Sequence, residues 1–438
     1  MAKPLKILII SAFFPPQNSI GGQRPYSFAK YWSRMGHSVD VLTTAKDEID
    51  LDTYEDFTVY EVKASGFFNF LRFFYRKTVK ESTSSAASAS SASSKKGIIK
   101  RIFGWFKSRG LSTSTRMPDA LDLWVGPASR WAIGHGKKWD VVVSTFGPYA
   151  CHLIASKVIA RRLGTFWVAD FRDTWTDSPY YRGIPPFTYL EAVLENDLVH
   201  GADLVTIVSE ALAVEMRTRF PTQKIFALEN GCDHEEIENL LDNNAYGNDF
   251  TFRFLYTGSL YPGIRDPSFL FSVLAELERD RGKLENLTFL FAGPNGDYVL
   301  ELAKQYGVSH LVENLGQMGR DESLRSQRDS DALLFFESVE STLTGKLFEY
   351  LFSGTPILSF GISDQSSAGS IIVETGTGIN FLSDRDKTKK ALMEIEESKR
   401  IAFYHPNSAE VKKYSRQGLA EKFMTLIQTH SQKLPSTD

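Results

Sequence analysis

The chain contains two successive series of short apolar runs, each the length of a β-strand, with helical patterns between them. The first series lies at 6–11, 39–44, 140–145, 165–170 and 204–209, and the second at 252–258, 287–293, 332–337 and 356–360. Apolar runs without polar alternation indicate strands buried on both faces, as in parallel sheets that are covered by helices. The pattern therefore predicts an α/β protein with two doubly wound parallel sheets.

Length and composition agree with two domains. A chain of 438 residues exceeds what one hydrophobic core usually organises, and 42% hydrophobic with 24% charged residues is typical of globular proteins. The polar, acidic segment DHEEIENLLDNNAYGNDFT separates the two series. We predict an N-terminal domain over 1–235, a linker over 236–250, a C-terminal domain over 251–400 and a helical segment over 401–438 that packs back on the N-terminal domain.

Charge is distributed unevenly along the chain. The formal net charge is −3, yet residues 66–116 hold eleven Lys and Arg and one acidic residue, Glu81. This basic insertion includes a run over 82–94 built only from Ser, Ala and Thr, which we predict to be a flexible tether because it cannot bury apolar surface.

The segments that flank the tether are amphipathic. If 66–80 and 98–109 are helical, Phe and Ile side chains lie on one side and Lys and Arg on the other. This pattern is typical of helices that lie in the interface of an anionic membrane, so we predict membrane docking through 66–110. Packing on the chain's own domain and nucleic-acid binding are the alternatives.

Cysteine usage and hydropathy bear on the compartment. Cys151 and Cys232 are too few and too far apart for a disulfide framework or a zinc cluster, which favours a reducing cytoplasm. No stretch approaches the roughly 18 apolar residues of a spanning helix, and we interpret the apolar start as a first strand rather than a signal peptide. We predict a cytoplasmic protein attached peripherally to the inner face of the plasma membrane.

Glycine-rich strand ends suggest sites for a phosphate in each domain. Gly21 and Gly22 precede a helical stretch, where free amides and the helix dipole can bind an anion. In the second domain, YTGSLYPGIRDP places Gly258, Ser259 and Arg265 at the end of a strand, where the arginine can clamp a diphosphate. Ordinary turn chemistry for the glycines and a solvated surface arginine are the alternatives.

The stretch TGKLFEYLFSGTPIL is the most informative. Lys346 and Glu349 are three residues apart, so they share one face at the start of a helix. The carboxylate suits a ribose diol, and a lysine at a helix start is electrostatically unfavourable unless an anion lies nearby. The alternative is a solvated ion pair between the two side chains.

Together these stretches resemble retaining glycosyltransferases of family 4, in which two Rossmann-like domains form the GT-B fold. The stretches that resemble family motifs are FFPPQNSIGGQR, VVVSTFGPYACHLIASKVIARRLGTFWVADFRDTW, YTGSLYPGIRDP and GKLFEYLFSGTPIL. They occur in the family's order, and the resemblance covers nearly everything except 45–115. It is strongest to enzymes that assemble bacterial surface polysaccharides, which implies a lipid-linked or glycan acceptor.

The resemblance also implies roles for individual residues. It implies that the donor nucleotide sugar is bound by Gly22, Gly258, Ser259, Arg265, Lys346 and Glu349, with the ribose on Glu349. The chain departs from the family at two positions, because Ser341 stands where a sugar-binding Glu is usual and Ser259 where an Arg is usual. Glu337 and Glu340 lie close to Ser341 in the chain.

The catalytic candidates lie in the first domain. ADFRDTWTD supplies Asp170 and Asp173 at a strand end, with His152 one element earlier, and by resemblance this strand end faces the sugar and the acceptor. The alternative for Asp170 is a helix-capping role. The short acidic motifs DLD at 50–52 and DSD at 329–331 mimic a metal site, but their settings favour chemistry without a metal or other cofactor.

These observations predict transfer of a sugar from a nucleoside diphosphate sugar, with retention of configuration. In this family retention is generally explained by same-face attack, in which an oxygen of the leaving group takes the acceptor's proton. A nucleotide-sugar epimerase of the same architecture and a non-catalytic partner protein are the alternatives. An NAD-dependent oxidoreductase would need the GxGxxG fingerprint, which is absent.

Overall fold

The computed structural model describes residues 3–16, 20–45, 56–65, 109, 115–162, 164–177, 182–238, 240, 246 and 251–431. The predicted tether at 82–94 and the amphipathic segments at 66–80 and 98–109 lie outside the described residues, apart from Arg109. Among the described residues, no helix is both long enough and apolar enough to cross a membrane.

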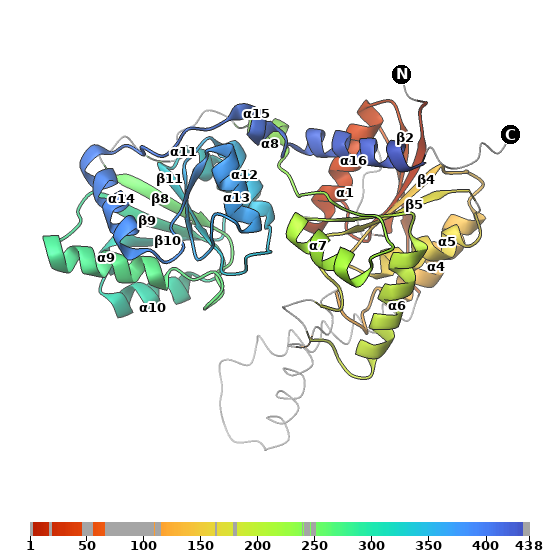
Figure 1. The fold of residues 1–438 in the computed structure, drawn as a ribbon, viewed down its shortest axis with the longest axis horizontal. Helices are drawn as coiled ribbons and strands as arrows, with labels where there is room; N and C mark the ends of the chain where they lie inside the picture. Colours follow the sequence, from red (N-terminus) through yellow and green to blue (C-terminus); the bar gives the residue numbers. More distant parts are fainter. Residues whose placement is uncertain are drawn as a thin grey trace, which may run out of the picture. The chain divides into compact units, whose positions relative to one another are not determined.

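The chain divides into two compact units (Figure 1). Unit 1 comprises Met1–Leu228 and Ala420–Asp438, and unit 2 comprises Glu229–Leu419. The sequence analysis places the first change of domain later, at 235. In the structure the residues just after Leu228 already pair within unit 2: the Cys232 amide donates to the Tyr414 carbonyl at 3.2 Å.

Unit 1 contains one parallel sheet of seven strands in the order β3-β2-β1-β4-β5-β6-β7. Its strands are β1 (Lys6–Ile10), β2 (Ser38–Thr44), β3 (Thr58–Val62), β4 (Val141–Thr145), β5 (Phe166–Phe171), β6 (Leu204–Ile207) and β7 (Ile225–Ala227). Its helices are α1 (Ile20–Arg34), α4 (Asp122–Gly134), α5 (Ala150–Ile159), α6 (Phe187–Gly201), α7 (Glu210–Arg219) and most of α16 (Arg416–Ser431).

The return of the chain to unit 1 is held by aromatic packing between α16 and α1. Phe423 lies 5.0 Å from Phe28 and 5.3 Å from Trp32 between ring centroids, and all three side chains are buried. The Trp32 indole also donates a hydrogen bond to the Ala420 carbonyl at 2.9 Å. The end of the described chain is therefore part of the core of unit 1.

Unit 2 contains a parallel sheet of six strands in the order β10-β9-β8-β11-β12-β13. Its strands are β8 (Phe252–Thr257), β9 (Leu287–Ala292), β10 (Val312–Gly316), β11 (Ala332–Phe336), β12 (Ile357–Phe360) and β13 (Gly378–Asn380). Its helices are α8 (His234–Glu238), α9 (Ser268–Arg281), α10 (Gly296–Tyr306), α11 (Arg320–Asp329), α12 (Gly345–Ser353), α13 (Ser367–Thr375), α14 (Arg385–Ser398) and α15 (Ser408–Lys412), with a 3₁₀ turn at Ser309–Leu311.

The interior strands of unit 2 are buried on both faces. Successive side chains of a strand point to opposite faces, so Phe254 and Tyr256 pack in one apolar cluster with α9, α10 and α14, whereas Leu255 packs in another with α12 and α13. Helices cover both faces of each sheet (Figure 1). The prediction of an α/β fold with two doubly wound parallel sheets is confirmed.

Candidate functional site

In unit 2 the end of β8 meets the start of α12 at Gly258. This glycine has φ +114°, a conformation that other residues rarely adopt. A Cβ atom at Gly258 would lie 2.9 Å from Nζ of Lys346, and the Gly258 amide is fixed by a 2.7 Å hydrogen bond to the Ala292 carbonyl. The backbone conformation therefore favours glycine here, and a larger residue would displace the end of the Lys346 side chain.

Lys346 carries a charge that the described part of the protein leaves without an ion pair. Its ammonium lies over the Tyr256 ring, 3.6 Å from the centroid, and it makes no hydrogen bond or ion pair with any described residue. Burial lowers the pKa of Lys346 well below its ordinary value and Arg265 lowers it further, while Glu349 and Glu337 oppose this. Because the lysine also stands at the positive end of α12, a bound anion would stabilise it.

Arg265 lies near Lys346 but has an acidic partner. Its Nε donates to Oε2 of Glu337 at 3.0 Å, and the Glu337 side chain is buried. The other carboxylate oxygen of Glu337 accepts from the backbone amides of Ser338 and Val339 at 3.1 and 3.3 Å. Much of the charge of Arg265 is thus neutralised within unit 2.

The two positions at which the chain departs from the family motif, Ser259 and Ser341, lie in loops that are held by local contacts. The Ser259 carbonyl accepts a hydrogen bond from the Tyr256 hydroxyl at 2.8 Å, which fixes the loop after β8. Glu340, which neighbours Ser341, accepts hydrogen bonds from the Ser363 amide at 3.1 Å and from its hydroxyl at 2.8 Å. Glu337 and Glu340 are therefore both engaged in holding loops.

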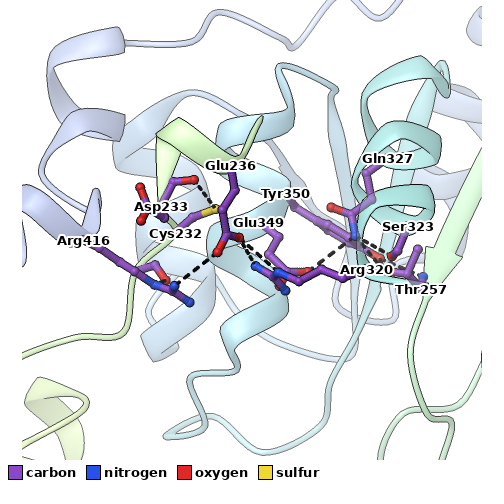
Figure 2. Close-up of polar contacts among 11 residues, drawn as sticks. Cys232, Asp233, Glu236, Thr257, Arg320, Ser323, Gln327, Glu349, Tyr350 and Arg416 are labelled. Atoms are coloured by element: carbon purple, nitrogen blue, oxygen red, sulfur yellow. Dashed lines mark hydrogen bonds and ion pairs between the residues drawn. The ribbon is translucent and has the colours of Figure 1, made fainter. Parts of the chain in front are cut away.

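Glu349 lies one turn after Lys346 on α12, but the two side chains do not form an ion pair, which excludes the solvated Lys–Glu pair. The Glu349 carboxylate instead accepts from Arg320 at 2.9 Å and from Gln327 at 3.5 Å (Figure 2). Arg320 also donates to Glu236 through two nitrogens, at 3.0 Å from Nε. Burial lowers the pKa of Arg320, but Glu349 and Glu236 outweigh it, so the net pKa is raised.

Sequence reasoning missed the residues that surround Glu349. Arg320 begins α11, and Gln327 is two turns later on the same helix. Tyr350, next to Glu349, accepts a hydrogen bond from the Thr257 amide at 3.0 Å and so ties α12 to the end of β8. No local spacing signals these partners, because each contact joins separate elements.

In unit 1, Asp170 at the end of β5 is enclosed by donors. Its carboxylate accepts from Nε and Nη2 of Arg24 at 2.9 and 2.7 Å and from the Thr206 hydroxyl at 2.7 Å. Asp170, Arg24 and Thr206 are all buried. The catalytic role of Asp170 stays a prediction, and these contacts favour a structural one.

His152 is a core side chain of α5. Its Nδ1 lies 2.7 Å from the Ser144 hydroxyl, and its ring packs against Phe146 and Phe171. Burial lowers the pKa of His152 to about 3, with Asp170 partly opposing, so the ring is neutral at pH 7. Its catalytic role is a prediction that this enclosure does not favour.

Asp173 is exposed in the loop after β5, unlike Asp170 and His152. Its neighbour Arg172 donates to the Phe146 carbonyl at 2.7 Å. A Cβ at Gly21 would lie 2.6 Å from the Arg172 guanidinium, and one at Gly22 would lie 3.2 Å from the Phe14 backbone. The two glycines therefore permit close packing at the start of α1.

The described residues contain no group of three or more His, Cys, Asp and Glu side chains that could hold a metal ion. Within DSD at 329–331, Asp329 pairs with Arg328 at 2.9 Å. The DLD motif at 50–52 lies outside the described residues.

No protein-family model matches the chain, and no curated protein does. Solved structures do match. A glycosyltransferase from Rickettsia africae is 13% identical over 99% of this chain and 100% of its own, with a TM-score of 0.59. Sucrose-phosphate synthase from Thermosynechococcus elongatus is 12% identical over 97% and 98%, with a TM-score of 0.60. HepE from Anabaena, in complex with UDP and glucose, is 13% identical over 97% and 100%, with a TM-score of 0.58.

The chain has the GT-B fold. The match extends over both units, and the parallel sheets of the two units agree with it. In sheets of this type ligands bind beyond the carboxyl ends of the strands, which is where Gly258 and Lys346 meet. The fold and the ammonium of Lys346, which has no ion pair among the described residues, therefore indicate the same ligand site, at the carboxyl ends of the strands of unit 2.

Proposed function

We propose that the protein is a retaining glycosyltransferase that transfers a sugar from a nucleoside diphosphate sugar to an acceptor without a bound metal. The observation that carries the proposal is Lys346, a cation at the start of α12 with no ion pair in the described structure, beside the glycine that ends β8. A diphosphate is the ligand that this charge suits best. HepE, which shares the fold, binds UDP and glucose.

The donor site follows from this placement. Lys346 would bind the diphosphate near Gly258, with Arg265 adding charge from its pair with Glu337. Glu349 would accept hydrogen bonds from the ribose. Charge that develops on the leaving diphosphate would be stabilised by these fixed groups, which is electrostatic catalysis.

The proposal also covers the proton transfer, the acceptor and the attachment to the membrane. In same-face attack an oxygen of the leaving diphosphate takes the proton of the acceptor hydroxyl, so no protein base is required. Asp173 is exposed and can orient an acceptor hydroxyl. We propose a lipid-linked or glycan acceptor and peripheral attachment at the cytoplasmic face of the plasma membrane, supported by the basic composition of 66–110.

A binding panel tests the donor. UDP-, GDP- and ADP-sugars are screened by thermal shift and then by calorimetry. One of them should raise the melting temperature, since a ligand at 100 times its Kd stabilises a protein by about 2.7 kcal/mol. Absence of binding to every member would contradict the proposal and favour a non-catalytic protein. Epimerised sugar formed without an acceptor would identify an epimerase.

Flotation with anionic liposomes tests the attachment. The full chain should float with the vesicles, and a variant lacking 66–110 should not. The deletion variant must show the same donor binding as the full chain, which establishes that it is folded. If it floats equally well, the membrane role of the insertion is wrong.

A further inference from the structure

The Glu349 carboxylate accepts two hydrogen bonds within the protein and can accept more. A carboxylate has about four lone-pair sites, two on each oxygen. Arg320 uses one site on Oε1 and Gln327 uses one on Oε2 (Figure 2). One acceptor site therefore remains on each oxygen, which matches the two adjacent hydroxyls of a ribose.

Of the two donors, Arg320 controls the orientation of Glu349 more strongly. The Gln327 amide nitrogen has two hydrogens but three acceptors: Thr257 Oγ1 at 3.1 Å, Ser323 Oγ at 3.2 Å and Glu349 at 3.5 Å. The contact to Glu349 is the longest of these and thus the weakest. The Arg320 contact is short, at 2.9 Å, and is made between charged groups.

Arg320 is itself held in place. Its Nε and Nη2 both donate to Oε2 of Glu236 on α8, which leaves Nη1 for Glu349. Arg416 lies 3.8 Å from the other oxygen of Glu236. Because a guanidinium is planar, fixing one edge on Glu236 also fixes the direction in which Nη1 points.

We infer that Arg320 is a positioning residue for ribose recognition: anchored on Glu236, it turns the Glu349 carboxylate so that one free acceptor on each oxygen faces a vicinal diol. This inference rests on the proposed function. It predicts that Arg320 determines the preference for ribonucleotides over nucleotides that lack the diol, although it does not touch the ligand.

The test is calorimetric titration of the full chain with the tightest binder among UDP, GDP and ADP, and with its 2′,3′-dideoxy counterpart. The wild type should bind the ribonucleotide about 10–100-fold more tightly, the range expected for hydrogen bonds to a charged group. Arg320→Met should reduce this ratio by about 10-fold while changing the dideoxy affinity by less than about two-fold. Arg328→Met, at the end of the same helix, should leave both affinities unchanged.

Two further variants keep the inference testable if Arg320→Met does not fold. Arg320→Lys keeps the charge but lacks the planar fork that holds one edge on Glu236 and directs Nη1 to Glu349, so the ratio should fall. Glu236→Gln removes only the anchor and should lower the ratio by less than Arg320→Met. A ratio that equals the wild-type value in folded Arg320→Met or Arg320→Lys overturns the inference alone. Wild-type protein that binds no nucleoside diphosphate overturns the proposed function, and the inference with it.

Discussion

The charged side chains at the strand ends of the two units differ in how they are neutralised. In unit 1, Asp170 is buried against Arg24 and Thr206, and the charges of Asp170 and Arg24 are paired at hydrogen-bonding distance. In unit 2, Lys346 rests on Tyr256 with no ion pair among the described residues. Charged groups at strand ends therefore differ: the Asp170 cluster is paired within the fold, whereas Lys346 has no ion pair in the described structure, and we propose an anionic ligand for it.

The largest expected effect is on the Asp170 cluster. Asp170→Asn leaves Arg24 buried without a counter-charge, which should lower the free energy of unfolding of unit 1 by about 3–5 kcal/mol. Urea denaturation followed by tryptophan fluorescence reports unit 1, because all seven Trp precede residue 229. Asp173→Asn, at an exposed position in the loop after β5, should cost less than about 0.5 kcal/mol. If both substitutions lower the free energy of unfolding equally, the buried ion pair of Asp170 does not stabilise unit 1 more than the exposed Asp173 does.

Substitution of Lys346 should have the opposite pattern: it should weaken ligand binding without destabilising the protein. Lys346→Met should weaken binding of a nucleoside diphosphate about 10–100-fold, yet leave the unligated protein at least as stable as the wild type, because a desolvated cation is removed. Calorimetry measures both quantities. Lys390→Met, on the surface of α14, is the control and should change neither. Loss of stability in Lys346→Met would indicate that the lysine supports the fold.

Buried His152 makes the free energy of unfolding of unit 1 depend on pH. Its pKa is about 3 in the folded protein and near 6.5 when unfolded, so the unfolded state takes up the proton first. The stability that depends on neutral His152 is present above pH 6.5 and is lost as pH falls toward 3, by about 1.4 kcal/mol per pH unit. His152→Asn should show a correspondingly smaller pH slope between 6.5 and 5.5 in the tryptophan-monitored urea experiment. An unchanged slope would show that the ring is not buried as a neutral group.

The smallest expected effect concerns Arg265, which is paired with Glu337 but is less buried than the Arg24–Asp170 pair. Glu337→Gln keeps the shape of the side chain but releases the charge of Arg265, so nucleoside diphosphate affinity should rise by up to about five-fold, the value of a partly exposed ion pair. The matched change Glu340→Gln, whose partner is the uncharged Ser363, should have no such effect. Weaker binding in Glu337→Gln would mean that the pair orients Arg265 rather than neutralising it.

The fold could be predicted from the sequence as far as the centre of each sheet. Each of the nine apolar runs contains a strand, and those nine are the interior strands of the two sheets. The four strands without such a run, β3, β7, β10 and β13, are the sheet edges. These edge strands are partly exposed, and β7 and β13 are only three residues long, so they lack the continuous apolar sequence that burial on both faces imposes.

The candidate site, too, could be predicted only in part from the sequence. Spacing within one helix predicts that Lys346 and Glu349 are neighbours, and the family resemblance suggests their roles. The ion-pair partners of the candidate residues come from other parts of the chain: Arg320 is 29 residues from Glu349 and 84 from Glu236, and Arg24 is 146 from Asp170. Local patterns carry no information on such pairs, so only the folded chain reveals which charges are paired.

The packing of Phe423 against Phe28 and Trp32 has a consequence for biosynthesis. Unit 1 cannot complete its core until residues after Leu419 leave the ribosome, which happens after all of unit 2 has been translated. At about 5–20 residues per second, the roughly 190 residues of unit 2 delay this step by about 10–40 s. During that interval the aromatic side chains of α1 lack their final partner, and unit 2 is complete at its end, before the residues of α16 that pack on α1 have been translated. The second unit to be synthesised is thus the first that can finish folding.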